Sequence, residues 1–411
     1  MKILIYGLHF KPDLIGIGKY TGEMTDWLFD HGHDIRVITA PHYYPEWKLK
    51  QRFLWHKKEH NPYLTWRCPI YVPSQPNGIT RLLHLLSFAL SSIPIVIKNI
   101  SWKPDFIVSI EPPFFTTPFA IFYSKITKAK SILHVQDLEI DAAYSLNILK
   151  KGIFYRIILK IEKYILNRFD VILTISPMMK SEIIQKSVHK DKIYVLPNWA
   201  DTENIHPTID NKYLRNRLSI KPKQKIILYS GNIGEKQNLP NLINVAEKIQ
   251  ADNCNYIFLI IGDGAFKKRL VKDVKKRNIF NIVLLPLQPS RDLGALLTMA
   301  DIHLVMQDKN ISDYVLPSKL TNILSAGGVS IISAKQGTQL SQLVKKHEIG
   351  YLVEPDSESE LYAAIIYLLV NKSQHNAIST NARKYAEKYL SKEKILSDFE
   401  NNVLINGVIN K

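Results

Sequence analysis

Short apolar runs alternate with longer segments of helical spacing along almost all of the 411 residues of this chain. The runs are nearly continuously apolar, which is typical of parallel strands that helices cover on both faces. The expected strands are residues 2–7, 34–39, 106–109, 131–135, 171–175 and 193–196, followed in the second half by residues 225–230, 256–261, 282–284, 302–305, 329–333 and 351–353. This pattern predicts an α/β fold with doubly wound parallel sheets.

A polar stretch at residues 206–224 interrupts the alternation. We therefore expect two Rossmann-like domains, residues 1–205 and 225–372, with the polar stretch as their linker. Residues 373–411 have helical spacing and no further strand, so we expect them to pack back on the first domain as helices. Ligands of open parallel sheets bind beyond the carboxyl ends of the strands, which places the expected site in a cleft between the domains.

The charge of the chain limits its partners. The sequence has 54 Lys and Arg against 37 Asp and Glu, a formal charge of +17 that is spread over both halves. Such a balance favours anionic partners, and a coat of solvated lysines explains it equally well. No helix-turn-helix, RRM or KH pattern accompanies the charge, so nucleic acid is not an expected partner. The two cysteines lie far apart without metal-ligand spacing, so we expect no metal site and a reducing, cytoplasmic location.

The N-terminus is expected to form a strand rather than a signal peptide, because polar residues follow its apolar run at once. The longest uncharged stretch is residues 82–97. As a helix it measures about 24 Å, short of the roughly 30 Å hydrocarbon core of a bilayer. We therefore expect that this stretch does not span a membrane.

Two glycine loops follow strands of the second half. In SGNIGEKQ, Gly231 permits a tight turn, the amides at the start of the next helix can bind anionic oxygens, and Lys236 supplies a positive charge for a diphosphate. After the next strand, Gly262 and Gly264 allow the backbone to approach a ligand closely. Both loops are candidate sites for an anionic ligand.

The segment PSKLTNILSAGG is a third candidate, because its proline starts a helix and its two glycines end it. Ser318, Lys319 and Asn322 then occupy the first helical turns and face the expected cleft. The amide of Asn322 can donate to and accept from the vicinal hydroxyls of a ribose. Leu287 lies near the expected base pocket and does not choose between guanine and uracil.

The loop after the first strand contains Gly16 and Gly18 but misses the GxGxxG spacing of dinucleotide-binding folds. A nicotinamide cofactor is therefore not favoured. The loop leads into a helix whose first amides can bind a phosphate or a sugar hydroxyl. An ordinary βα turn explains it equally well.

The fourth strand of the first half leads into a run of polar side chains. His134 and Gln136 alternate onto one side, and Asp137, Glu139 and Asp141 follow in the loop. Three acids could bind a metal or act as acid and base, but no His or Cys accompanies them at ligand spacing. We expect them to make polar contacts with a substrate.

In combination, PNWADTENIHP, SGNIGEKQ, IGDG and PSKLTNILSAGG resemble the motifs of glycosyltransferase family 4, and within it the bacterial exopolysaccharide enzymes of the colanic acid fucosyltransferase type. The resemblance covers nearly the whole chain. It implies the GT-B fold, in which two Rossmann-like domains face a cleft and a C-terminal helix crosses back. It also implies the retaining transfer of a sugar from a GDP- or UDP-linked donor, GDP-fucose in the closest resemblance, with no required cofactor or metal. The first domain would bind the acceptor and the second the donor.

Carried over by residue, the resemblance implies that Lys236 contacts the donor diphosphate and that Gly16 and Gly18 approach the sugar or the diphosphate. Gly262 and Gly264 would lie under the nucleoside. The other implied donor contacts are Gly231, Asn232, Leu287, Ser318, Lys319 and Asn322. The catalytic positions would be Lys236, Asp137 and Gln136, with His134 and Glu139 on the acceptor side.

The chain departs from the family pattern at four positions. Asn232 stands where an arginine is frequent, so half of the usual positive clamp on the leaving diphosphate is absent or supplied elsewhere. Gln136 replaces a histidine, and Tyr314 and Asn322 stand where glutamates are usual. These departures affect the mechanism more than the fold.

Residues 43–66 mix aromatic with basic side chains, among them Trp47, Trp55, Lys57 and Lys58. Together with residues 82–97 they predict a docking face for the anionic inner membrane, with aromatic packing inside the first domain as the alternative. The resemblance implies a polyprenyl-diphosphate-linked saccharide acceptor and thus a cytoplasmic, peripheral enzyme. A GT-B sugar-nucleotide epimerase or hydrolase and a non-catalytic sugar-nucleotide-binding protein are the other functions left open.

Overall fold

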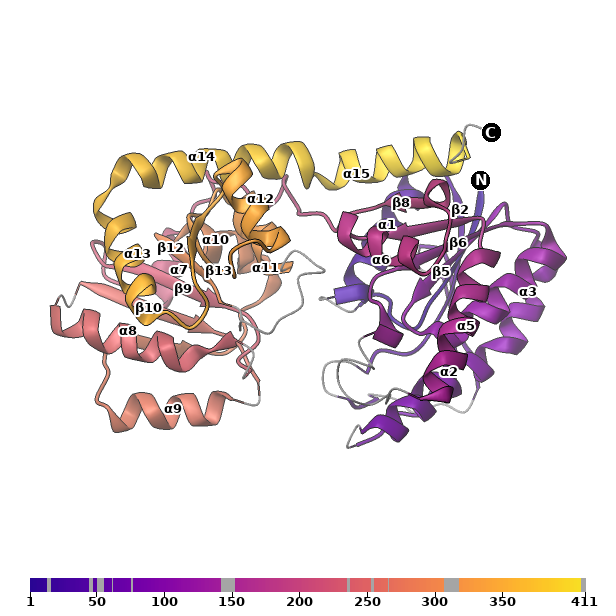
Figure 1. Ribbon diagram of the computed structural model, residues 1–411, viewed down its shortest axis with the longest axis horizontal. Helices are drawn as coiled ribbons and strands as arrows, with labels where there is room; N and C mark the ends of the chain where they lie inside the picture. Colours follow the sequence, from indigo (N-terminus) through magenta and orange to yellow (C-terminus); the bar gives the residue numbers. More distant parts are fainter. Residues whose placement is uncertain are drawn as a thin grey trace. The chain divides into compact units, whose positions relative to one another are not determined.

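The computed structural model describes residues 1–12, 16–43, 47–49, 55–60, 62–74, 77–141, 152–234, 237–252, 255–264, 266–306 and 318–407. The chain divides into two compact units (Figure 1). Unit 1 comprises Met1–Pro197 with Leu396–Lys411, and unit 2 comprises Asn198–Ile395. The first domain therefore ends at Pro197 and not at residue 205 as the sequence pattern predicts.

Unit 1 contains a sheet of eight strands in the order β3-β4-β2-β1-β5-β6-β7-β8. Neighbouring strands are parallel except β3 and β4, which form an antiparallel pair at one edge. The strands are β1 (Lys2–Tyr6), β2 (Asp34–Thr39), β3 (Lys57–His60), β4 (Leu64–Arg67), β5 (Phe106–Glu111), β6 (Lys130–Val135), β7 (Val171–Thr174) and β8 (Ile193–Val195). The six predicted strands are confirmed, and the pair β3 and β4 is added from the aromatic and basic segment.

Helices cover this sheet. On one face lie α2 (Gly78–Lys98), α3 (Thr117–Thr127), α5 (Ile153–Arg168) and α6 (Pro177–Gln185), with short turns η1 (Ile100–Trp102), η2 (Phe114–Thr116) and η3 (Lys190–Lys192) between elements. Phe88, Tyr123 and Leu166 from the first three helices share one buried cluster with Leu133 of β6. α1 (Gly16–Asp30) buries side chains that lie outside this cluster, against the opposite face. Cover on both faces explains why the strands are continuously apolar.

The long uncharged stretch forms α2. A capping box between Asn77 and Thr80 starts the helix, which runs for 21 residues and thus about 31 Å. In the described part of the chain it is the one helix long and apolar enough to cross a bilayer, so the prediction that it is too short is wrong. His84, Phe88 and Val96 are buried inside unit 1, so α2 packs along one side against the sheet.

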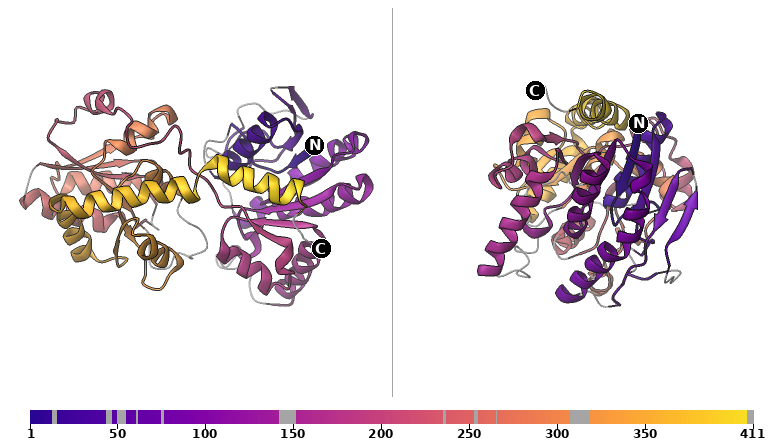
Figure 2. Two further views of the ribbon diagram at one scale, coloured as in Figure 1. Left: turned by 90° about the horizontal axis from the view of Figure 1, so that it is seen from above. Right: turned by 90° about the vertical axis from the view of Figure 1, so that its right-hand side faces the viewer.

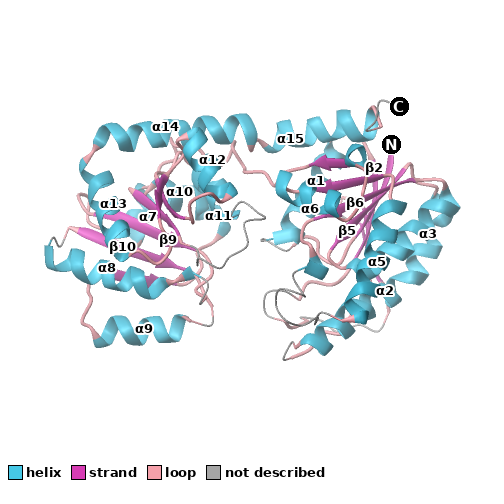
Figure 3. Ribbon diagram, in the orientation of Figure 1, coloured by secondary structure: helices cyan, strands magenta, loops and turns pink. Residues whose placement is uncertain are grey.

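Unit 2 contains six strands, all parallel, in the order β11-β10-β9-β12-β13-β14 (Figure 3). They are β9 (Lys225–Ser230), β10 (Tyr256–Ile261), β11 (Ile282–Leu285), β12 (Ile302–Val305), β13 (Ser330–Ser333) and β14 (Tyr351–Val353). All six strands predicted for the second half are therefore confirmed, with ends that differ by one residue at most.

The helices of unit 2 are α7 (Lys212–Arg217), α8 (Leu239–Asp252), α9 (Lys267–Lys276), η5 (Ser290–Asp292), α10 (Leu293–Thr298), α11 (Ser318–Ser325), α12 (Gln339–His347), α13 (Glu358–Val370) and α14 (Lys372–Tyr389). Leu214 and Ile220 are buried in the core of this unit, so the stretch predicted as a linker is part of it.

The C-terminal helices divide between the two units. α14 buries Ala382 and Ala386 in unit 2 and runs along its outside (Figures 1 and 2). After it, α15 (Lys392–Phe399) and the π-helical turn η6 (Glu400–Ile405) end the chain. Only the residues from Leu396 onward group with unit 1, a shorter return than the sequence pattern predicts.

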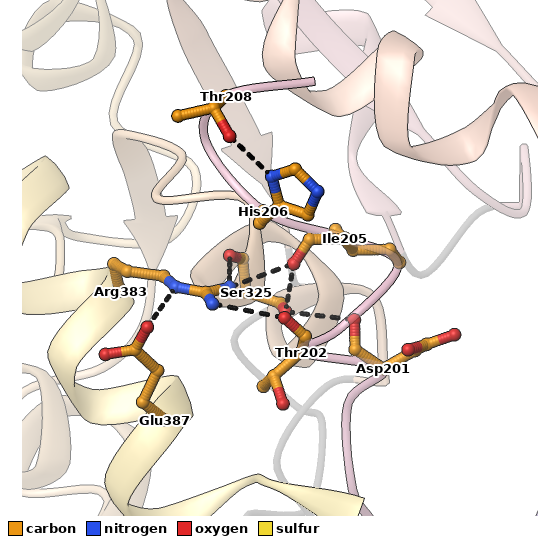
Figure 4. Close-up of polar contacts among 8 residues, drawn as sticks. All are labelled: Asp201, Thr202, Ile205, His206, Thr208, Ser325, Arg383 and Glu387. Carbon is orange, nitrogen blue, oxygen red and sulfur yellow. Dashed lines mark hydrogen bonds and ion pairs between the residues drawn. The ribbon is translucent and has the colours of Figure 1, made fainter.

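An arginine of α14 donates hydrogen bonds to backbone carbonyls of the segment PNWADTENIHP (Figure 4). Arg383 donates to the carbonyls of Ser325 at 2.7 Å, Ile205 at 3.0 Å and Thr202 at 3.1 Å. The hydroxyl of Ser325 also donates to Ile205 O at 2.8 Å, and Glu387 accepts from Arg383 Nε at 2.7 Å. These hydrogen bonds therefore hold the first residues of unit 2 against α11 and α14.

Candidate functional site

Two glycine loops meet at the carboxyl ends of β9 and β10 in unit 2. Gly231 donates its amide to Ile261 O at 2.9 Å, and Ile233 donates to Asp263 O at 2.8 Å. Phe266 then donates to Ile233 O at 3.0 Å. These backbone hydrogen bonds join residues 231–234 to residues 262–264 and 266, and we call this arrangement the glycine platform.

Glycine is required where the two loops touch. A Cβ at position 262 would overlap the carbonyl oxygen of Gly231, and a Cβ at position 264 would overlap that of Ile233. Gly264 also has φ +152°, a region that side chains disfavour. Gly262 and Gly264 are thus explained by contact between loops, and their place under a nucleoside stays a prediction.

Lys319 lies beside the glycine platform, in the first turn of α11. Its Nζ is 4.5 Å from the ring centroid of Tyr229, and Tyr229 in turn donates its hydroxyl to Asn232 O at 2.6 Å. A Cβ on Gly231 would lie 3.8 Å from Lys319 Cδ, so the lysine stem covers that glycine. The lysine is therefore held against the loop that follows β9.

Among the described residues, no carboxylate balances the positive charge of Lys319. Burial lowers the pKa of its ammonium group to about 8, and no carboxylate contributes to that shift. Within the residues that the structure describes, Nζ forms no ion pair. A partly desolvated cation without a counter-ion is unfavourable, so this position is suited to an anion that arrives from solution.

Asn322 follows Lys319 by three residues, on the same side of α11. Its Oδ1 is buried and accepts no hydrogen bond from the described residues. A buried amide oxygen without a donor costs free energy until a hydroxyl or an N–H reaches it. The first amides of α11 also lack partners within the helix. One helical turn thus offers a cation and a buried acceptor, and the amides that start the helix point in the same direction.

The other predicted donor residues have mixed positions. Lys236 lies outside the described residues, and so does the side chain of Ser318. Asn232 is exposed and brings no charge to the loop. Leu287 is 65% exposed, so no wall of described residues forms a base pocket around it.

In unit 1, Gly16 starts α1 at the carboxyl end of β1 with φ +64°. Apart from its chain neighbours and its own helix, no described atom lies within 4 Å of the place where its Cβ would stand, and Gly18 is buried two residues later. The helix thus begins at the first of the two glycines that the sequence analysis places in the preceding loop. The open space at Gly16 is compatible with the predicted approach of a sugar or a phosphate.

Beyond β6, the predicted polar residues differ in their surroundings. His134 is buried, and burial lowers its pKa to about 4, so its ring is neutral. Gln136 Nε2 lies 3.3 Å from His134 Nε2, while the buried His134 Nδ1 has no hydrogen-bond partner among the residues that the structure describes. Burial raises the pKa of Asp137 and of Glu139, and Glu139 accepts from the Phe114 amide at 2.8 Å.

Asp141 belongs to an ion triad, and its predicted contact with a substrate stays a prediction. Lys186 donates to Asp141 and to Glu162 at 2.5 Å each. This ion triad neutralises the third of the three predicted acids. Within the described ranges, no group of His, Cys, Asp and Glu side chains has the arrangement of a metal site.

Glu111 is the residue that the sequence analysis misses. It ends β5, is 2% exposed, and its Oε2 has no hydrogen-bond partner among the described residues. Burial raises its pKa well above the usual value, and the nearby carboxylates of Glu139 and Glu162 raise it further. Glu111 is therefore a neutral acid at the end of a central strand. The acid that ends the run FIVSIE was the available signal.

Most aromatic residues of the predicted docking segment belong to the core. Tyr43, Tyr63 and Trp66 are buried, and Trp47 packs against the same core cluster. Trp55 is 80% exposed. Lys57 and Lys58 lie on β3, and Lys58 Nζ is 5.6 Å from the Trp66 ring centroid. The prediction that the aromatic rings of this segment form a docking face is therefore wrong for Tyr43, Tyr63 and Trp66, which are buried.

Comparison with known proteins gives the same division of the chain. The family described as "Glycosyl transferase 4-like domain" matches residues 16–199, and "Glycosyl transferases group 1" matches residues 210–385. The putative colanic acid biosynthesis glycosyl transferase WcaI of Escherichia coli (strain K12) is 42% identical over 98% of this chain and 100% of its own.

Two solved structures show the same fold at low identity. HepE from Anabaena, in complex with UDP and glucose, has a TM-score of 0.69 at 15% identity, covering 98% of this chain and 99% of its own. WaaG, a glycosyltransferase involved in lipopolysaccharide biosynthesis, has a TM-score of 0.67 at 13% identity, covering 98% of this chain and 100% of its own.

Proposed function

We propose a specific reaction for this chain, which belongs to the glycosyltransferase family matched above and has the GT-B fold: the retaining transfer of a sugar from a nucleotide diphospho-sugar to a lipid-linked saccharide. The name of the relative from E. coli supports a place in the biosynthesis of colanic acid or a similar exopolysaccharide or capsule. GDP-fucose is the proposed donor, and UDP in the HepE complex makes UDP-sugars the alternative.

Lys319 carries the proposal. It is a cation without a described counter-ion, held at the carboxyl ends of the strands where a doubly wound sheet binds its ligand. A nucleoside diphosphate supplies the missing negative charge. Lys319 then also provides the positive charge that Asn232 lacks at its own position.

The chemistry of transfer fits these residues. As the bond to the sugar breaks, negative charge grows on the departing diphosphate, and fixed donors that meet this charge lower the barrier. Lys319 Nζ and the first amides of α11 bind the diphosphate, with Lys236 as a second cation. Asn322 Oδ1 accepts from a ribose hydroxyl. We assign donor binding to unit 2 and acceptor binding to unit 1.

On the acceptor side, Asp137 and Glu139 are proposed to hold a sugar hydroxyl of the acceptor. Burial raises the pKa of both carboxyl groups, which strengthens them as proton acceptors once ionised. His134 and Gln136 orient this loop through their mutual contact. No residue is assigned as a nucleophile. We also propose a cytoplasmic location at the membrane surface, since a lipid-linked acceptor would be found there.

A thermal-shift panel with GDP, UDP, ADP and their sugar conjugates tests the donor. A nucleotide that binds only the folded protein raises its stability by about 2.7 kcal/mol at 100 times its Kd. We expect shifts with GDP and GDP-fucose. A shift with UDP alone would replace the named sugar, and the absence of any shift would contradict donor binding in unit 2.

Lys319→Gln tests the observation that carries the proposal. The variant is expected to bind the selected nucleoside diphosphate about tenfold more weakly, because one charge-assisted contact is lost. Lys345→Gln, which removes an exposed lysine on α12, is the matched control and leaves affinity unchanged. Equal affinity in both folded variants would contradict the role of Lys319.

A further inference from the structure

Three helices of unit 1 expose large apolar side chains to solvent. These residues, each at least 45% exposed, are Ile79, Leu82, Leu83, Leu90 and Ile97 on α2, Phe122 and Ile126 on α3, and Ile153, Ile157, Ile161 and Tyr164 on α5. Scattered exposed apolar residues are ordinary on a protein surface. Here they gather on three elements, which is typical of an interaction surface.

The three helices share one direction of exposure. Their inner sides are buried in one cluster against the same face of the sheet. α3 contacts α2 on one side and α5 on the other, and all three lie side by side in unit 1 (Figure 1). The outer sides therefore form one continuous surface, which we call the α2-α3-α5 face.

On α5 the exposed apolar residues form a regular stripe. Ile153, Ile157, Ile161 and Tyr164 recur every three or four residues, so they line one side of the helix. Leu166 is buried on the other side, in the core. The outer stripe is thus additional to the side that folding requires.

The charge on this face has one sign. The exposed charged residues of the three helices are Arg81, Lys98, Lys125, Arg156, Lys160, Lys163 and Arg168. By sequence the three helices contain one acid, Glu162, which is buried and paired with Lys186 at 2.5 Å. The aliphatic rows are therefore surrounded by positive charge that nothing on the face neutralises.

We propose that the α2-α3-α5 face docks on an anionic lipid bilayer, with the three helices in the plane of the interface. Aliphatic side chains enter the boundary between headgroups and acyl chains, while the lysines and arginines reach lipid phosphates. A second copy of the chain does not suit the face, because the same positive charges would oppose each other. This deepens the proposed function and rests on it only for the lipid-linked acceptor that docking would bring within reach.

Vesicle flotation of the full chain tests this docking without donor or acceptor. We expect binding to vesicles of phosphatidylcholine with phosphatidylglycerol, weak binding to phosphatidylcholine alone, and release by salt. The apolar variant carries Ile153→Ser, Ile157→Ser and Ile161→Ser, and the charge variant carries Arg156→Gln, Lys160→Gln and Lys163→Gln. Each is expected to lower the partition coefficient about tenfold or more.

A charge-matched control lies in unit 2. Lys272→Gln, Lys275→Gln and Lys276→Gln remove three exposed lysines from α9, and binding is expected to stay at the wild-type level. Equal loss in the control would mean that net charge alone binds the vesicles, which overturns the assignment to this face. Unchanged binding of both α5 variants overturns it as well, and so does a dimer that the apolar variant dissociates.

The donor thermal shift separates this inference from the proposed function. Variants that keep the nucleotide shift are folded, so their loss of flotation reports docking alone. If the wild-type chain floats but transfers no sugar to a lipid-linked acceptor, docking stands and the proposed function fails. If it transfers sugar but does not float, docking fails and the proposed function stands.

Discussion

Both units end their central strands in polar loops, and the buried titratable group differs between the two edges, a cation in unit 2 and an acid that burial keeps neutral in unit 1. In unit 2 the buried group is the ammonium of Lys319, which has no described counter-ion. In unit 1 it is the carboxyl of Glu111, whose neighbours Glu139 and Glu162 disfavour its ionisation. An edge with an unbalanced cation suits an anion, and an edge with neutral acids suits hydroxyl groups. The same doubly wound architecture occurs in both units, and its strand ends suit an anion in unit 2 and hydroxyl groups in unit 1.

The sharpest way to break this comparison is to remove positive charge from the donor edge. Lys236→Ala is expected to lower sugar transfer by about 10²-fold or more, since a main stabiliser of the leaving diphosphate is lost. Steady-state transfer to a defined acceptor measures the effect. Nearly normal turnover by the folded variant would remove Lys236 from the mechanism.

Lys319→Met tests whether the cation at this edge is retained for function at a cost in stability. Transfer is expected to fall about 10²-fold. The variant is also expected to be more stable at pH 7 by about 1–2 kcal/mol, a figure reduced because the side chain is only half-buried. Urea denaturation measures the second effect.

The pH dependence of that gain has a definite sign. Burial lowers the pKa of Lys319 to about 8 in the folded protein, against about 10.4 in an unfolded chain. The unfolded state therefore binds more protons between these values, and the wild-type stability rises with pH across that window. The advantage of the methionine variant is expected to vanish above about pH 10. A loss of stability at pH 7 would contradict the unbalanced charge.

Arg383→Ala changes stability without touching either edge, and so provides a reference for the comparison. The variant leaves three backbone carbonyls without their shared donor and is expected to lose about 2 kcal/mol. Arg383→Lys should recover only part of it, because a lysine cannot bridge three acceptors with a planar group. Denaturation curves of the two variants measure this, and equal stability of both with the wild type would contradict the fastening role.

The smallest expected effect concerns Glu111. Since burial raises the pKa of this carboxyl in the folded state, its contribution to stability is present at low pH and is lost as pH rises through that pKa. Glu111→Gln mimics the neutral form and is expected to match the wild type at about pH 3.5, below the unfolded pKa of about 4.3, and to exceed it by about 1 kcal/mol at about pH 8. A constant difference at both pH values would show that the carboxyl ionises in the folded protein over the same range as in the unfolded chain, which contradicts the raised pKa.

The sequence predicts the framework of this fold well, because strands covered on both faces leave a signal at each strand. The sequence analysis does not predict the strands β3 and β4, because the aromatic residues of this segment were interpreted as an exposed docking face. Trp66 of β4 is instead buried in the core. The boundary at residue 205 was misplaced since the polar stretch after it holds only two buried anchors, Leu214 and Ile220. The polar residues around Leu214 and Ile220 made this stretch look like a linker, so the burial of the two side chains could not be predicted.

The site was less predictable, since its chemistry depends on neighbours that are distant in sequence. The sequence identifies Lys319 as a donor contact, but its lack of a counter-ion appears only when α11 is placed against Tyr229. Glu111 is a single acid after an apolar run, so nothing local indicates that Glu162 lies near it. The glycines of the platform indicate that the backbone approaches another group closely, but the sequence does not show that this group is the neighbouring loop.

The overlap that any side chain at position 262 would create has a consequence for how relatives of this protein can diverge. Any substitution of Gly262 displaces the neighbouring loop, so donor preference cannot change gradually through substitutions at this position. Donor preference is then expected to change through α11, where Lys319 and Asn322 can be exchanged one at a time. Libraries that seek a new sugar donor should vary that helical turn and keep the glycines fixed.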